Sequence, residues 1–137
     1  MSQYISDILR ALVAKRANYC CEYCGVHQED LVFTFQVDHI ISLKHFGSTT
    51  ASNLAFACSL CNQNKGSNIA TIMLDSGRMV RLFNPRKDKW RTHFGLLNGQ
   101  ILAKTRIGIA TIHVLDLNNL DRVLLRKVLE EVGRYPR

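Results

Sequence analysis

The sequence has no long hydrophobic run: its apolar stretches are a handful of residues long, and Asp7 and Arg10 already interrupt the first ten residues. A membrane-spanning helix needs about 20 consecutive apolar residues, so the pattern predicts no membrane partner, and no export signal is visible. We therefore expect a cytoplasmic protein. A chain of 137 residues also has room for about one domain and none for a second large one.

Acidic residues are few, with 11 Asp and Glu against 18 Lys and Arg, which gives a formal net charge of +7. The surplus is concentrated between residues 78 and 106, where Asp88 is the one acid and the basic residues are Arg78, Arg81, Arg86, Lys87, Lys89, Arg91, Lys104 and Arg106. A localised basic segment beside Trp90 and Phe94 is suited to contact nucleic-acid phosphates. A solvated basic face has the same composition, so the segment alone does not decide the function.

Four of the five cysteines form two pairs with the same spacing, Cys21-x-x-Cys24 and Cys58-x-x-Cys61. A two-residue spacer turns both thiolates toward one centre, so two pairs supply the four ligands of a closed, structural zinc site. Two disulfides are the alternative, which a chain without an export signal disfavours. Cys20 has a three-residue spacer to Cys24 and is expected to be a buried apolar residue.

The first half of the chain predicts a helix, two strands and a second helix. Ser6 or Asp7 can cap a helix to about residue 18, with Ile8, Leu12 and Val13 on one face. The β-branched and aromatic run 31–37 predicts a strand that ends just before Asp38 and His39, and the run 53–57 predicts its partner. The second cysteine pair then opens a short helix that Gly66 ends.

The second half predicts a strand at 78–83, a hairpin and two helices. Asn98-Gly99 lies between the runs 93–97 and 100–104 and favours a two-residue turn, because both positions need positive φ. Helices are expected at about 106–115 and 119–132, with Thr105 and either Asn118 or Asn119 as N-caps.

Residues with metal-binding and acid–base chemistry lie between and directly after the cysteine pairs. Asp38 offers a carboxylate and Asn62 an amide oxygen, which are hard ligands suited to Mg²⁺ or Mn²⁺. His39, with an ordinary pKa of about 6.5, can accept a proton near neutral pH. Any one of these residues has a plainer structural explanation, so the argument rests on their combination.

In order, type and spacing, about a third of the chain resembles the HNH endonuclease family in its zinc-stapled bacterial form. The matching residues are Cys21-x-x-Cys24, Val37-Asp38-His39-Ile40, Asn53-Leu54 and Cys58-x-x-Cys61-Asn62-x-x-Lys65-Gly66. A weaker likeness to the tail of small stand-alone HNH proteins comes from Asn84-Pro85-Arg86, Trp90 and His93-Phe94.

The resemblance implies an α+β fold with a ββα-metal (His-Me finger) core, a four-cysteine zinc site, an N-terminal helix, a C-terminal β-hairpin and two final helices. Residues 1–137 are expected to form a single HNH nuclease domain, with a catalytic module at about 19–70 and a basic hairpin and helical tail at about 71–137. His39 would be the general base, Asp38 and Asn62 would hold the catalytic Mg²⁺ or Mn²⁺, and Asn53 would position His39. The third letter of the family name is often His, and Asn62 in its place favours Mg²⁺ or Mn²⁺ over a transition metal.

The sequence therefore predicts a metal-dependent nuclease that cuts DNA, most of all double-stranded DNA, although nothing in it excludes RNA. The predicted nucleic-acid contacts are Lys65, Arg78, Arg81, Arg86, Lys87, Lys89 and Arg91. A homodimer is one possible source of sequence preference. The alternative is a non-catalytic zinc-ribbon adaptor, which would need only the cysteines and the basic residues. The other histidines, His27, His45, His93 and His113, are expected to be structural or solvent-facing.

Overall fold

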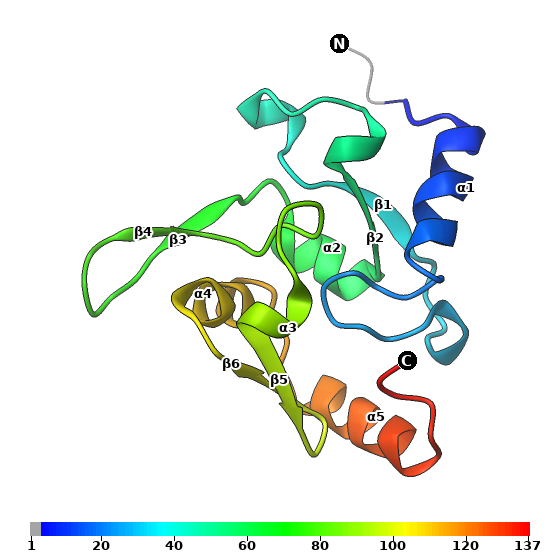
Figure 1. Ribbon diagram of the computed structural model, residues 1–137, viewed down its shortest axis with the longest axis vertical. Coiled ribbons are helices and arrows are strands. Elements are labelled where there is room, and N and C mark those ends of the chain that lie inside the picture. The colour runs from blue at the N-terminus through cyan, green and yellow to red at the C-terminus, as the bar shows by residue number, and fades with distance from the viewer. Residues whose placement is uncertain (1–3) are drawn as a thin grey trace.

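A computed structural model describes residues 4–137, which form five α-helices and three separate two-stranded antiparallel hairpins (Figure 1). The helices are α1 (Asp7–Arg16), α2 (Ser59–Lys65), α3 (Trp90–His93), α4 (Arg106–Val114) and α5 (Leu120–Glu131). The hairpins pair β1 (Gln36–His39) with β2 (Leu54–Ala57), β3 (Ala70–Ile72) with β4 (Met79–Arg81), and β5 (Phe94–Leu97) with β6 (Gln100–Ala103). Short 3-10 turns are η1 (Gln28–Asp30), η2 (Leu43–His45) and η3 (Ala51–Asn53). Within this range no helix has the length and apolar character needed to cross a bilayer.

Helix α1 begins where the sequence predicts, because the Ser6 hydroxyl accepts a hydrogen bond from Leu9 N at 3.2 Å. It packs against β1 and β2. The predicted buried face is wrong in part: Val13 is fully buried, but Ile8 is 83% and Leu12 46% exposed. The face toward the hairpin is centred on Val13 and includes Leu9, which leaves Ile8 and Leu12 on its solvent side.

The first strand is displaced from its predicted position. Strand β1 begins at Gln36, whereas Val32 and Phe33 lie in a loop with 94% and 64% of their surface exposed. Its antiparallel partner β2 has only four residues, which pair from Gln36↔Ala57 to His39↔Leu54. Pairing therefore holds residues 36–39 as strand and leaves the β-prone residues before them without a partner strand. Asp38 and His39 consequently lie within the strand and not after it.

The hairpin β5–β6 and the last two helices confirm the predicted turn and caps. Asn98 and Gly99 have φ values of 50° and 81°. The side chains of Thr105 and Asn119 accept hydrogen bonds from backbone N–H groups in the first turns of α4 and α5. The β3–β4 hairpin projects from the body of the molecule (Figure 1).

The tail shares its core with the segment that carries the first cysteine pair. Phe83 makes edge-on contacts with Tyr23 and Phe94, at ring-centroid distances of 6.4 and 5.4 Å. Trp90 Nε1 donates to Tyr23 O at 2.8 Å, and the Tyr135 hydroxyl donates to Cys24 O at 2.7 Å. These contacts bind the tail, residues 71–137, to the cysteine segment, so the tail takes part in fixing the site.

Candidate metal centres and active site

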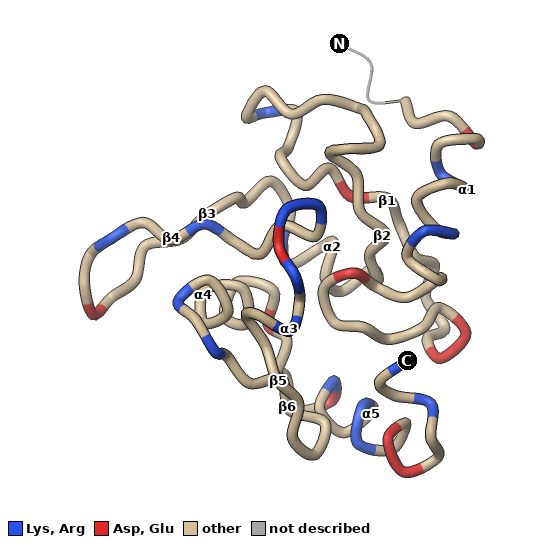
Figure 2. Tube along the Cα trace, viewed as in Figure 1, with Lys and Arg blue, Asp and Glu red and all other residues tan. Residues whose placement is uncertain are grey.

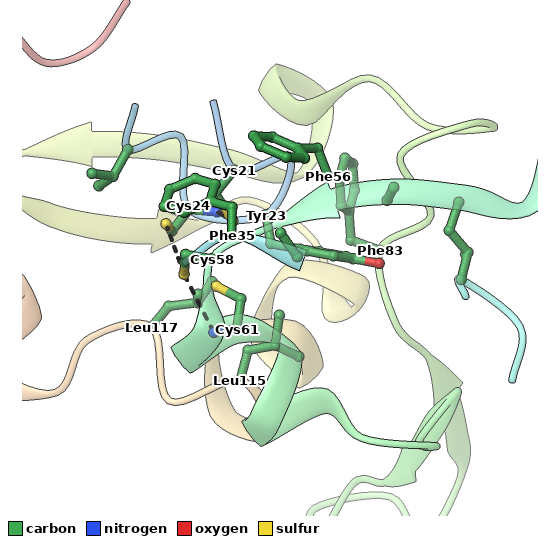
Figure 3. Close-up of a cluster of buried hydrophobic side chains, with 14 of the residues drawn as sticks. Cys21, Tyr23, Cys24, Phe35, Phe56, Cys58, Cys61, Phe83, Leu115 and Leu117 are labelled. Carbon is green, nitrogen blue, oxygen red and sulfur yellow. Dashed lines mark hydrogen bonds between the residues drawn. The ribbon is translucent and has the colours of Figure 1, made fainter. Parts of the chain in front are cut away.

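The four paired cysteines meet at the start of α2, as Figure 3 shows. All four are buried, and their sulfur atoms lie within 4.8 Å of one another. Tetrahedral zinc with Zn–S bonds of about 2.3 Å requires sulfurs separated by roughly 3.8 Å, close to the 3.9 Å between the sulfurs of Cys24 and Cys58. Each pair also closes its own turn, since Cys24 N donates to Cys21 Sγ and Cys61 N to Cys58 Sγ. Soft ligands at these separations fit a structural zinc ion.

Two features of this centre differ from what the sequence indicated. Cys20 was expected to be buried, yet it is partly exposed, and its thiol donates to Asn18 O at 3.6 Å. Arg122, on the buried face of α5, donates from Nη2 to Cys61 Sγ at 2.9 Å and from Nη1 to Leu115 O at 2.8 Å. Four thiolates around Zn²⁺ carry a net negative charge, so a buried guanidinium beside them offsets part of it. An arginine on an amphipathic helix normally faces solvent, which is why sequence reasoning missed it.

A second site lies on the hairpin β1–β2 and the other end of α2. It is a cavity of about 300 Å³ lined by Val37, Asp38, His39, Ser42, Leu43, Lys44, Asn62, Gly66 and Ser67. Asp38, His39 and Asn62 thus line the same cavity. The cavity also contains Lys44 and Ser42, which nothing in the sequence pattern singled out.

Asp38 is almost completely buried and is held by two side chains. The Tyr23 hydroxyl donates to Asp38 Oδ2 at 2.7 Å, and Lys65 Nζ lies 3.1 Å from the same oxygen. Burial raises the pKa of Asp38 above its usual value, while the Lys65 ammonium and the Tyr23 hydroxyl oppose that shift. Tyr23 is a spacer residue of the first cysteine pair, so the zinc centre and the cavity are joined through one aromatic ring.

Lys65, which the sequence predicts to contact a phosphate, is buried in the structure. Only 1% of its surface is exposed, and its ammonium contacts Asp38 and donates to His39 O at 3.0 Å. A buried ammonium needs a partner charge, and Asp38 supplies it. Lys65 therefore belongs to the inner framework of the site, where it holds the two neighbouring residues of β1.

His39 lines the cavity with its ring fixed by the following loop. Nε2 lies 2.9 Å from Thr49 Oγ1, and Nδ1 has no hydrogen-bond partner among residues 4–137. Partial burial lowers the pKa of the imidazole, with Lys65 lowering it further and Asp38 opposing the shift. The lowered pKa favours the neutral imidazole, which is the form that can accept a proton.

Asn53 and Asn62 hold very different positions. Asn53 holds the loop between β1 and β2 through its side-chain amide. Ile41 N donates to Asn53 Oδ1 at 2.9 Å, and Asn53 Nδ2 donates to Ile41 O and Ser48 O at 2.9 and 2.8 Å. Asn62, in α2, faces the cavity, and its Nδ2 donates to Gln36 Oε1 at the start of β1. The first asparagine thus acts on backbone, while the second leaves its side-chain oxygen available.

The remaining histidines line neither site. His27 caps η1 by accepting from Glu29 N, and His45 is exposed on η2. His93 is buried and lies 2.6 Å, through Nδ1, from Thr105 Oγ1, while His113 is exposed on α4. Neither the cavity-lining residues nor the cysteine cluster include any of them.

The structure divides the basic segment into paired and unpaired residues. Lys and Arg mark the β3–β4 hairpin and the stretch between β4 and α3 in Figure 2. Arg81 binds Asp88 through two hydrogen bonds, and Arg86 pairs with Glu22 of the first cysteine loop. Within residues 4–137, no side-chain ion pair forms at the exposed positions Arg78, Lys87, Lys89 and Arg91, although Arg91 lies over the Trp90 ring at 5.7 Å. Lys104 is likewise exposed without an ion pair in that range and donates to Arg91 O at 3.0 Å, so these five residues of the segment remain available to a polyanion.

The comparisons with known proteins match the part of the chain that contains both sites. Residues 21–68 match the family described as HNH endonuclease, a range that contains both cysteine pairs and every residue of the cavity. Septu protein PtuB of Bacillus thuringiensis is 24% identical over 123 residues, which cover 88% of this chain and 45% of that protein. The chain therefore spans less than half the length of this relative, and no solved structure matches it significantly. The cysteine cluster, the cavity and the family match coincide, so residues 21–68 are similar to the HNH endonuclease family in the part of the chain that contains both sites.

Proposed function

We propose that the protein is a metal-dependent endonuclease that hydrolyses phosphodiester bonds of DNA, double-stranded DNA above all. The observation that carries the proposal is the cavity in which a neutral histidine, a carboxylate and an amide oxygen meet. On this proposal β1, β2 and α2 form the ββα-metal arrangement, with the zinc centre fixing the position of α2 against the hairpin.

The donors around the cavity suit a hard divalent cation. Asn62 uses its Nδ2 on Gln36, so its Oδ1 is the atom left for a cation, and Asp38 Oδ1 is approached within residues 4–137 by Lys65 alone, at 3.3 Å. On the same wall the buried Ser42 hydroxyl has no hydrogen-bond partner in that part of the chain. Asp38 and Asn62 would therefore hold Mg²⁺ or Mn²⁺, which when bound stabilises charge on the phosphate and on the leaving 3′ oxygen.

The chain's own residues would then act as follows. In the tautomer of His39 whose Nε2–H donates to Thr49 Oγ1, the Nδ1 lone pair takes a proton from the attacking water. Asn53 keeps the loop that carries Thr49 closed over the strand, so it acts on His39 through the backbone. Lys65 fixes the position of the Asp38 carboxylate relative to the His39 carbonyl, because its ammonium contacts both. The expected products carry 5′-phosphate and 3′-hydroxyl ends.

The test is cleavage of supercoiled plasmid by the purified protein with Mg²⁺ or Mn²⁺, alongside His39→Ala. Loss of a general base should reduce the rate by about 100-fold or more while leaving zinc content and thermal midpoint unchanged. His113→Ala, at an exposed histidine on α4, is the matched control and should cut like the parent. Equal cutting by His39→Ala would refute the assigned base.

The cleavage products also distinguish a monomer from a homodimer, DNA from RNA as the substrate, and a nuclease from a non-catalytic adaptor. Direct formation of linear plasmid without a nicked intermediate would indicate two centres acting together, as in a homodimer. Parallel reactions on duplex, single-stranded and RNA substrates define the preferred nucleic acid. If the parent protein binds DNA but cuts none of these with either metal, the zinc-ribbon adaptor becomes the better description.

A further inference from the structure

Phe46 presents the most exposed aromatic ring of residues 4–137, with 99% of its surface in solvent. It ends the turn η2 with φ of 68°, in the left-handed region that a bulky residue rarely adopts. The backbone conformation costs free energy in the isolated protein, and the exposed ring gains none from burial. A residue that is strained and also leaves a large ring in solvent is a candidate for a role in binding.

The loop around Phe46 is held by many short contacts. Ser42 O accepts hydrogen bonds from both His45 N and Gly47 N at 2.9 Å. Gly47 packs so closely that a Cβ atom there would lie 1.7 Å from Ile41 O, and Asn53 clasps Ile41 and Ser48 on either side. The ring therefore projects from a fixed backbone, and binding through it would require little additional ordering.

The same loop forms part of the cavity that contains His39. Leu43 and Lys44 line that cavity, and Thr49 binds the His39 ring, so Phe46 lies between two residues that reach the site. From His39 to residue 74 the sequence contains no Asp or Glu, whereas Lys44 directly precedes the pair His45-Phe46. The surface offered beside the cavity is thus aromatic and cationic, without an acid that would repel a phosphate backbone.

We propose that Phe46 stacks on a nucleobase of the substrate next to the scissile phosphate, with Lys44 on the adjoining backbone phosphate. The proposal rests on the proposed nuclease function, since it places the bound nucleic acid across the cavity. An aromatic ring stacks on any base, because every base has a π-face, and one such contact changes binding by about 5-fold to over 100-fold. Phe46 thereby sets the register of the strand over His39, and it favours a base that is unpaired or easily unstacked.

The test compares Phe46→Ala, Phe46→Leu and Phe46→Trp, each in the His39→Ala background for binding and in the parent for cleavage. Binding is measured by fluorescence anisotropy of labelled single-stranded and duplex oligonucleotides. We expect Phe46→Ala to weaken binding about 10-fold and Phe46→Trp to bind at least as well as the parent. Phe46→Leu keeps an apolar side chain but cannot stack, so it should resemble Phe46→Ala.

Two controls exclude a structural explanation. The Phe46 ring is almost wholly in solvent and supports no packing, so the thermal midpoint of every variant should equal that of the parent. Phe33→Ala removes another exposed phenyl ring, which lies before β1 and does not line the cavity, and should leave binding unchanged. A 2-aminopurine base beside the cut site reports stacking directly, and its fluorescence change should disappear in Phe46→Ala.

The outcomes distinguish this inference from the proposed function. If the parent cuts DNA and Phe46→Ala binds and cuts equally well, the stacking role is refuted and the nuclease stands. If the parent binds nucleic acid through Phe46 but never cuts it, the inference stands and the proposed activity fails. Full activity of Phe46→Leu would also overturn the proposal, because it would reduce the contact to a general apolar one.

Discussion

Helix α2 borders two sites that differ in almost every physical respect. Its first turn and the residue before it supply Cys61 and Cys58 to a closed centre of four buried sulfurs, whereas the next residue, Asn62, faces an open cavity with oxygen and nitrogen donors. In the sulfur centre every ligand points at its neighbours. In the cavity the metal-binding candidates are engaged by other side chains, Asp38 by Lys65 and Asn62 by Gln36. The geometry of the first site suits a retained structural metal ion, and that of the second suits an exchangeable ligand.

The largest effect should follow from opening the closed centre. Cys61→Ser, or removal of zinc with a chelator, deprives the fold of a contribution that reaches roughly 10 kcal/mol in small zinc domains. We expect loss of cooperative thermal unfolding, followed by circular dichroism, and loss of bound zinc by mass spectrometry. Cys20→Ser is the matched control because Cys20 lies outside the cluster, and it should keep one zinc per chain. A folded, zinc-free Cys61→Ser protein would show that the centre is dispensable.

The next effect tests how the cavity holds its carboxylate. Lys65→Met removes the partner of a buried charge, which costs about 3–5 kcal/mol in comparable cases. The free energy of unfolding, measured with urea, should fall by that amount, and most of it should return in the double variant with Asp38→Asn. The double variant should not cut DNA, because Asp38→Asn removes the carboxylate that is proposed to hold the catalytic cation. If Lys65→Met alone is as stable as the parent, the buried ion pair does not hold the site.

A smaller effect is expected where the tail touches the zinc centre. Arg122→Met loses the hydrogen bond to Cys61 Sγ, and hydrogen bonds to charged groups contribute about 1.5–3 kcal/mol. Zinc should then leave faster in competition with a colorimetric chelator, with a lower thermal midpoint. Lys127→Met changes an exposed residue of the same helix and should alter neither value. Equal zinc release by both variants would assign Arg122 a packing role alone.

The sequence predicts the features that depend on local contacts, and it does not predict those that depend on residues far away in the chain. Cysteine spacing, the Asn98-Gly99 turn and the caps Ser6, Thr105 and Asn119 follow local rules, and the structure confirms them. The start of β1 differs from the prediction because pairing with β2, and not β-propensity, decides where a strand begins. The burial of Lys65 and Arg122 depends on partners 27 and 61 residues away, Asp38 and Cys61. Such tertiary partners leave no signal in the spacing of a single sequence.

The smallest effect concerns the basic segment, where pairing separates residues that look alike in sequence. Lys87 and Lys89 are exposed without ion pairs in the described chain, so replacing both with Gln removes two candidate phosphate contacts. Each contact contributes about 0.9 to the slope of log binding constant against log salt, so the slope should flatten by about 2. Arg86→Gln should instead lower stability, because Arg86 pairs with Glu22, whose carboxylate also accepts from Phe56 N. An unchanged salt slope in the lysine pair would remove this stretch from the nucleic-acid interface and leave the loop at Phe46 as the main contact.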